Sequence, residues 1–230
     1  MPPKVKNPGT CDVSGTSGNP IIGPCKIIGL SNCAIGSSNG ECISKPIGPS
    51  KGNAWLSNKD IDNTLRNLTK EFPKMYHMEF QMIDFQHKTH PTELGKINIP
   101  DDVINKGFNT LAVVINTDTR RGVGEHWFCV FMDFRKAPYT LEYFNSSGRL
   151  PYVPIQYLFA KIAKQFRKNK IDYKEIINSG TVHQQDTDSE CGVYSLFYIY
   201  NRLKGVPPED INTTRIPDGK MLAFRQHLFR

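Results

Sequence analysis

The sequence lacks three features that would place the chain in a familiar class at once. No apolar run approaches the roughly 20 residues that span a bilayer, so we predict no transmembrane helix and no membrane partner. The first residues contain no apolar segment of the kind that directs secretion, which predicts an intracellular protein with reduced thiols. None of the 6 cysteines belongs to a Cys-x-x-Cys pair, so we expect no metal site.

The composition is typical of a folded globular protein. Hydrophobic residues make up 38% of the chain and charged residues 22%, which argues against a disordered protein. The formal net charge of +7 permits an acidic partner such as nucleic acid, but it does not establish one. A length of 230 residues is enough for one substantial core, or for one core with an arm.

The composition changes just before Trp55. Residues 1–52 contain half of the 18 glycines together with many serine, proline and asparagine residues, so we interpret them as an N-terminal arm. Four cysteines at irregular spacing lie in this arm, and we interpret them as packed or incidental thiols. Residues 53–230 then form the predicted main domain.

The main domain alternates between helical and strand patterns. Apolar residues at helical spacing, with capping and breaking residues at the ends, predict helices over 57–68, 154–168, 191–203 and 218–229. Short runs rich in β-branched and aromatic residues predict strands over 111–116, 126–134, 139–145 and 171–177. This mixture predicts an α+β fold.

Cys191 stands in the first turn of a predicted helix and is followed by Gly192. The positive end of the helix dipole and the free N–H groups there would stabilise a thiolate over a thiol. A glycine would also let a substrate carbonyl approach the backbone closely. On this local pattern alone, a nucleophile and a packed structural thiol are equally plausible.

Gln185 lies six residues before the cysteine. A neutral amide can donate a hydrogen bond to a developing oxyanion without adding charge. Together with the backbone N–H of Cys191 it would form a two-donor oxyanion hole. The neighbouring Gln184 offers the same chemistry, so the choice within this pair stays open.

A nucleophilic thiol needs a base, and the chain has 6 histidines. His126 has the most suggestive setting, because it begins an apolar strand after a Gly-Val-Gly-Glu turn and Trp127 would shield its ring. Asn145 ends the following strand, where antiparallel pairing would bring its side-chain oxygen to the imidazole. Glu142 is the rival acceptor, but strand alternation places it on the opposite face.

These residues together resemble the motifs of a known protease family. Segments 124–127, 142–146 and 185–192 are similar, in this order, to motifs of the cysteine proteases that include SUMO-specific proteases and the adenovirus maturation protease. The similarity is greatest to the polyprotein-processing proteases of African swine fever virus and related large DNA viruses, which share the asparagine in a Tyr-Phe-Asn-Ser setting. Trp55 and residues 224–230 also resemble this family.

The resemblance covers about residues 53–230 and implies a papain-like catalytic domain with a central mixed β-sheet and a buried helix carrying the nucleophile. It implies a cysteine endopeptidase that cuts viral structural precursors after Gly-Gly-type sites, in the host cytoplasm or the virion, without a cofactor. The implied catalytic residues are Cys191, His126, Asn145 and Gln185, and the implied cleft residues are Trp55, Trp127 and Gly192.

Three alternative functions stay open. The first is removal of a ubiquitin-like modifier, whose tail also ends in Gly-Gly, and the second is acetyl transfer of the kind found in some bacterial effectors. The third is DNA binding without catalysis, for which the best support is the cluster Lys161, Lys164, Arg167 and Lys168, although we prefer to interpret this cluster as a solvated helix face. Because the adenovirus relative is activated by DNA, the resemblance also leaves activation by DNA or by a peptide partner open.

Overall fold

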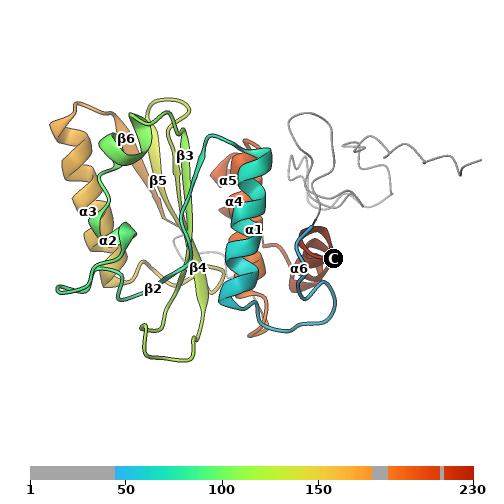
Figure 1. Ribbon diagram of the computed structural model, residues 1–230. Coiled ribbons are helices and arrows are strands. Elements are labelled where there is room, and N and C mark those ends of the chain that lie inside the picture. The colour runs from blue at the N-terminus through green and yellow to red at the C-terminus, as the bar shows by residue number, and fades with distance from the viewer. Residues whose placement is uncertain (1–44, 178–185, 213–214) are drawn as a thin grey trace, which may run out of the picture.

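The computed structural model describes residues 45–177, 186–212 and 215–230, which form a sheet with helices on both faces (Figure 1). One face carries α1 (Asn58–Glu71), α4 (Cys191–Leu203), α5 (Pro208–Asn212) and α6 (Asp218–Leu228). The other carries α2 (Glu93–Lys96), the short helix η1 (Ile99–Ile104) and α3 (Val153–Lys168). This arrangement confirms the predicted α+β class.

The sheet is mixed and has six strands. They are β1 (Met75–His77), β2 (Gln81–Met82), β3 (Thr110–Asn116), β4 (Trp127–Asp133), β5 (Tyr139–Phe144) and β6 (Tyr173–Ile177). Strands β1 and β2 pair in parallel with β3, while β3, β4 and β5 are antiparallel neighbours and β6 is parallel to β5. The last four strands match the predicted ones to within two residues at each end, whereas β1 and β2 were not predicted.

The central strands are buried on both faces, and their side chains alternate between two apolar cores. The core under α1, α4 and α6 contains Val114, Cys129 and Phe144. The core under α3 contains Val113, Val130 and Tyr143. This alternation also directs Glu142 toward α4, because neighbouring side chains of a strand point to opposite faces.

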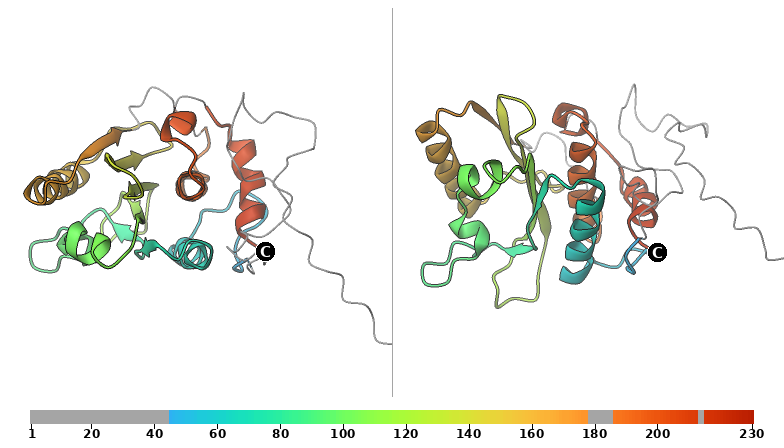
Figure 2. Two further views of the ribbon diagram at one scale, coloured as in Figure 1. Left: turned by 90° about the horizontal axis from the view of Figure 1, so that it is seen from above. Right: turned by 45° about the horizontal axis from the view of Figure 1, so that its top comes forward.

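All 13 residues of α4 are buried, so the helix lies in the interior between the sheet, α1 and α6 (Figure 2). A helix that is apolar around its whole circumference is expected in such a position. Neither α4 nor any other helix in the described part of the chain is long and apolar enough to cross a bilayer. The buried helix begins at Cys191, as the resemblance implied.

Helix α1 begins with a reciprocal capping box. The hydroxyl of Ser57 accepts a hydrogen bond from the Asp60 N–H at 3.3 Å, and the Asp60 carboxylate accepts one from the Ser57 N–H at 2.9 Å. Ser57 is therefore the N-cap of the helix. It also fixes the preceding residue, Leu56, whose carbonyl contacts the candidate site.

The segment of residues 45–50 packs against α6 (Figures 1 and 2). The Arg230 N–H donates to the Pro46 carbonyl at 3.1 Å. Gly48 faces the ring of Phe229 so closely that an added Cβ would clash with it. The end of the predicted arm therefore contacts the last helix, and the boundary near residue 52 stays a prediction.

Candidate active site

Strands β4 and β5 bring His126 and Asn145 together at one end of the sheet. His126 directly precedes β4, Asn145 directly follows β5, and the two strands are antiparallel neighbours. The His126 Nε2 and Asn145 Oδ1 atoms are 2.7 Å apart. The structure thus places these two predicted residues in direct hydrogen-bond contact.

The hydrogen bonds around Asn145 determine which nitrogen of His126 carries the proton. Asn145 Oδ1 also accepts from the Ser147 backbone N–H at 3.0 Å and from the Ser147 hydroxyl at 2.8 Å, while Nδ2 donates to the Tyr143 hydroxyl at 3.0 Å. A backbone N–H can only donate, so the atom facing Ser147 and His126 must be the amide oxygen. His126 Nε2 therefore donates to it, which leaves Nδ1 with a free lone pair.

The surroundings of His126 favour its neutral form. Burial lowers the pKa of the imidazole, the hydrogen bond to Asn145 opposes this shift, and the positive charge of Arg149 lowers the pKa further. A neutral imidazole with an unprotonated Nδ1 is the form that can act as a general base.

Helix α4 places the Cys191 thiol against the beginning of β4. The backbone N–H groups of Trp127, Gly192 and Cys191 itself lie close enough to the sulfur to lower the pKa of the thiol. Since Trp127 follows His126 in the chain, the thiol lies beside the segment that carries the imidazole. The predicted nucleophile on α4 therefore lies next to the strand that directly follows the predicted base.

Burial of Cys191 opposes the expected preference for a thiolate at the start of α4. Burial raises the pKa of the Cys191 thiol, the three backbone N–H groups oppose this shift, and the negative charge of Glu190 raises the pKa further. The sequence pattern misses this effect because the helix begins in the interior, where desolvation outweighs the helix terminus.

Trp127 and Gly192 are packed together beneath the surface. The Trp127 side chain is 4% exposed, its Nε1 donates to the Leu56 carbonyl at 3.0 Å, and the Phe80 ring meets it edge-on. A Cβ at Gly192 would lie 3.2 Å from both Leu56 and Trp127. Packing is thus tight here, and a larger residue would have to displace Leu56 or Trp127 slightly. Of the three predicted cleft residues only Trp55 is exposed, and their role in binding substrate stays a prediction.

Gln185 lies outside the described residues, as do Gln184 and His183, so its oxyanion role stays a prediction. The next described residue is Asp186. Its backbone N–H donates to the Asp218 carboxylate at 3.2 Å, and the Thr187 N–H does so at 2.8 Å. Helix α6 therefore anchors the segment that follows Gln185.

Glu142 is engaged elsewhere and does not contact His126. Its fully buried carboxylate accepts from the Tyr198 hydroxyl at 2.8 Å and from Arg202 Nε and Nη2 at 2.8 Å each. Both donors belong to α4. Strand alternation therefore excluded Glu142 correctly, and Asn145 is the partner of His126.

Sequence reasoning overlooked a buried ion pair next to the thiol. Arg225 Nη2 donates to both carboxylate oxygens of Glu190, at 2.9 and 3.0 Å. The signal was present, because Arg225 occupies a position on the apolar face of the last helix, in register with Met221, Phe224 and Leu228.

The predicted basic patch on α3 is not a uniform surface. The Lys161 ammonium donates to the Gly95 carbonyl at 2.9 Å, and burial lowers its pKa. Lys164, Arg167 and Lys168 remain exposed. Lys161 is therefore directed toward α2 and not into solvent with the other three, and DNA binding stays a prediction.

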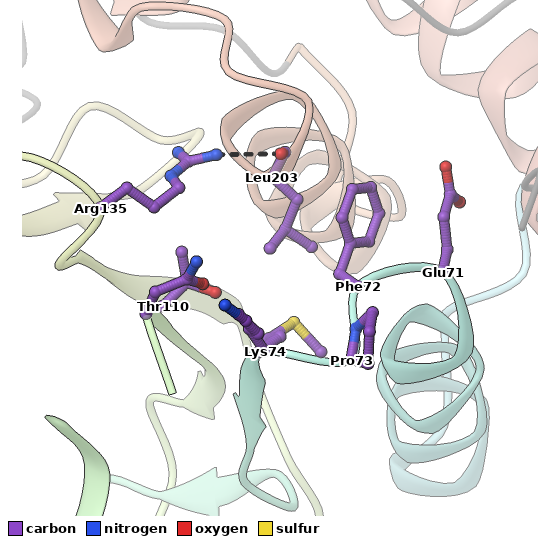
Figure 3. Close-up of a pocket in the computed structure, with 9 residues that line it drawn as sticks. Glu71, Phe72, Pro73, Lys74, Thr110, Arg135 and Leu203 are labelled. Atoms are coloured by element: carbon purple, nitrogen blue, oxygen red, sulfur yellow. Dashed lines mark hydrogen bonds between the residues drawn. The ribbon is translucent and has the colours of Figure 1, made fainter. Parts of the chain in front are cut away.

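A pocket between α1, β3 and α4 lies away from the thiol (Figure 3). Its lining includes Phe72, Thr110 and Leu203. Thr110 begins β3, six residues before the end that pairs with Trp127, which is about 20 Å along the strand. In the described ranges, no three His, Cys, Asp or Glu side chains gather as a metal site requires.

Comparison with known proteins gives consistent matches. Residues 65–230 match the family described as Ulp1 protease family, C-terminal catalytic domain. The SUMO-1 cysteine protease S273R of African swine fever virus (isolate Pig/Kenya/KEN-50/1950) is 33% identical over 196 residues, covering 81% of this chain and 71% of the viral protein. The putative thiol protease R355 of Acanthamoeba polyphaga mimivirus is 30% identical over 186 residues, covering 80% of this chain and 59% of its own.

The three-dimensional comparison agrees with these matches. The crystal structure of the African swine fever virus pS273R protease superposes with a TM-score of 0.72 at 31% identity, covering 81% of this chain and 71% of that one. The shared structure therefore extends over most of both chains.

Proposed function

Because the chain belongs to the Ulp1 protease family and is a cysteine protease, we propose that Cys191 is its nucleophile, His126 its general base and Asn145 the residue that orients the base. The observation that carries this proposal is the set of hydrogen bonds that fixes the His126 tautomer. Asn145 Oδ1 accepts from Ser147 and from His126 Nε2, so Nδ1 is left available for the thiol proton.

The proposed reaction is acyl transfer through a thioester. His126 Nδ1 takes the proton as the Cys191 sulfur attacks the peptide carbonyl carbon, and the oxyanion accepts from the Cys191 N–H and from Gln185. The imidazolium then protonates the leaving amine, and His126 activates the water that hydrolyses the thioester. Burial raises the pKa of the thiol and lowers that of the imidazole, so proton transfer accompanies attack and does not precede it.

The proposed substrate is a structural precursor polyprotein of a large DNA virus, cut after a Gly-Gly-type sequence. Support comes from the relatives at 30% identity or more, which are proteases of African swine fever virus and a mimivirus. The proposal places the reaction in the host cytoplasm or the virion, with no metal or organic cofactor. A ubiquitin-like conjugate is the competing substrate, because its tail offers the same two glycines.

Covalent labelling tests the proposed nucleophile. A Gly-Gly peptide whose C-terminal carboxyl is replaced by a vinyl sulfone should form a stable thioether with Cys191, as mapped by mass spectrometry, and His126→Ala should slow that modification strongly. Cys129 is a matched control, because it is the other buried free cysteine among the described residues and lies on β4. Cys129→Ser should label normally. Labelling at another residue, or labelling that does not depend on His126, contradicts the proposal.

Competing substrates test the proposed specificity. The enzyme should be incubated separately with a viral capsid precursor, a SUMO conjugate and a ubiquitin conjugate, with and without duplex DNA. We expect cleavage of the precursor after Gly-Gly. Cleavage of the modifier conjugates alone would assign the chain to deconjugation instead, and a rate increase on adding DNA would establish DNA as an activator.

A further inference from the structure

Helix α6 holds the segment that leads into α4 at two points. Near the start of α6, the Asp218 carboxylate accepts from the backbone N–H groups of Asp186 and Thr187. Two turns later, Arg225 reaches both carboxylate oxygens of Glu190. A single helix therefore fixes the backbone just after Gln185 and the residue just before Cys191.

The ion pair between Arg225 and Glu190 is completely buried. Its side chains are 0% and 1% exposed, and Arg225 Nη1 also donates to the Pro49 carbonyl at 3.3 Å. Burying two charges carries a desolvation penalty that an apolar pair of similar volume would avoid. The two charges therefore need an explanation beyond packing.

The position of Glu190 supplies that explanation. It is bonded covalently to Cys191, and its negative charge raises the pKa of the thiol. A negatively charged carboxylate beside the nucleophile destabilises the negative charge that the sulfur gains during attack. Arg225 is the cation that offsets it, at 2.9 Å from the carboxylate.

The other charged groups packed around α4 are distant from the thiol or already balanced. The Arg202–Glu142 and Lys204–Glu71 pairs lie at the far end of the helix, about 17 Å along its axis from Cys191. The remaining titratable groups on the neighbouring elements are Lys59, Asp60, Asp62, Arg66 and Lys70 on α1, His126 before β4, Cys129 and Asp133 on β4, and Asp218, Lys220 and His227 on α6. The Asp218 carboxylate accepts a hydrogen bond from the Tyr194 hydroxyl, and the His227 ring stacks on Phe224. Both contacts lie beside parts of α4 that follow Cys191.

We propose that Arg225 is a positioning residue for catalysis, which fixes Glu190 at the start of α4 and offsets its charge so that Cys191 can become negative during attack. This inference rests on the proposed role of Cys191. Without Arg225, a buried and unbalanced carboxylate stands next to the nucleophile. Without Glu190, the guanidinium is unbalanced and favours the thiolate. The two single substitutions therefore have opposite effects on thiol ionisation, whereas a merely structural pair would give two losses of the same sign.

The test measures alkylation of Cys191 by chloroacetamide as a function of pH in Arg225→Met, Glu190→Gln and the double variant. In Arg225→Met we expect the midpoint to move to higher pH and the rate at pH 7 to fall roughly tenfold. In Glu190→Gln we expect the midpoint to move to lower pH, and in the double variant to return toward that of the unmodified enzyme. Lys204→Met neutralises a cation at the far end of the same helix and should leave the midpoint in place.

Two further variants keep the test decisive. Arg225→Lys retains the charge and should restore the midpoint, and Glu190→Gln carries the test if Arg225→Met fails to fold. A midpoint that stays fixed or rises in Glu190→Gln overturns the role of Arg225, as do shifts of equal sign in both single variants. Alkylation mapped to a residue other than Cys191 would instead overturn the proposed nucleophile, so the two failures are distinguishable.

Discussion

Helix α4 has a buried arginine–glutamate pair at each end, and the two pairs differ in how completely they are hydrogen-bonded. At the C-terminal end, Arg202 donates to Glu142 from Nε and Nη2, and Nη2 also reaches Asp133 at 3.2 Å. Its Nη1 donates to a backbone carbonyl. At the N-terminal end, Arg225 binds Glu190 through Nη2 alone, and within the described residues its buried Nε has no hydrogen-bond partner.

On our proposal, the same pair of residue types serves two purposes. The Arg202 pair joins α4 to β5 and uses every nitrogen of the guanidinium, as expected of an anchor in the core. The Arg225–Glu190 pair leaves the Arg225 Nε donor without a hydrogen bond among the described residues, and Glu190 directly precedes Cys191. We therefore expect the first pair to affect stability and the second to affect reactivity as well.

The largest expected effect comes from removing the reactive atom at the N-terminal end. Cys191→Ala should lower kcat/KM by roughly four orders of magnitude or more, because the attacking sulfur is lost. The free energy of unfolding, measured in urea, should change by no more than about 1 kcal/mol, since one buried sulfur is removed. Retained cleavage would refute the assignment of the nucleophile.

The second largest effect should come from the ion pair at the C-terminal end of α4. It should change the free energy of unfolding but not the reactivity of Cys191. Arg202→Met leaves the Glu142 carboxylate buried without its cation, which should lower the free energy of unfolding by about 3 to 5 kcal/mol. Urea denaturation measures this loss, and adding Glu142→Gln should recover part of it. The alkylation midpoint of Cys191 in the folded protein should not move, and a shift like that of Arg225→Met would erase the contrast between the two ends.

Asn145→Ala should reduce kcat/KM by a smaller factor of roughly tenfold to hundredfold, because the base stays but its tautomer is no longer fixed. The hydrogen bond to Asn145 raises the pKa of His126, so its removal lowers that pKa. The acid limb of the kcat/KM profile should therefore move to lower pH.

Asn145→Asp is the matched comparison for this substitution. A carboxylate favours the imidazolium, so it should move the acid limb to higher pH. Shifts in the same direction for both variants, or a loss in Asn145→Ala as complete as that in Cys191→Ala, would contradict the orienting role.

The smallest effect should arise at the cap of α1, away from both ion pairs. Ser57→Ala removes the capping hydroxyl and should cost about 1 kcal/mol of unfolding free energy in urea. Ser57→Asp retains an acceptor and should be close to neutral. Turnover by the folded protein should stay within about twofold in both variants, and a larger loss would mean that the cap also positions Leu56 for catalysis.

Local pattern predicted most of the elements and the pairing of His126 with Asn145. Apolar residues at helical spacing identify α1, α3, α4 and α6, and short runs rich in β-branched and aromatic residues identify strands β3 to β6. Strand alternation was enough to prefer Asn145 over Glu142. Strands β1 and β2 have three and two residues, too few for any period to appear.

What the sequence could not supply depends on packing between distant segments. The thiol of Cys191 is desolvated because α6, β4 and Leu56 enclose the start of α4, and no local pattern reports that enclosure. Gly192 is likewise explained by Trp127 and Leu56, which occupy the space beside it. Arg225 could be noticed as a charge on an apolar face, but its partner is 35 residues away in the chain.

The position of α6 after α4 has a consequence for the timing of synthesis. A ribosome makes Cys191 and Glu190 well before it makes Arg225, so a nascent chain that already contains the nucleophile still lacks the cation that offsets its acidic neighbour. On our proposal, the thiol gains its full reactivity only once the last helix has been translated and has docked.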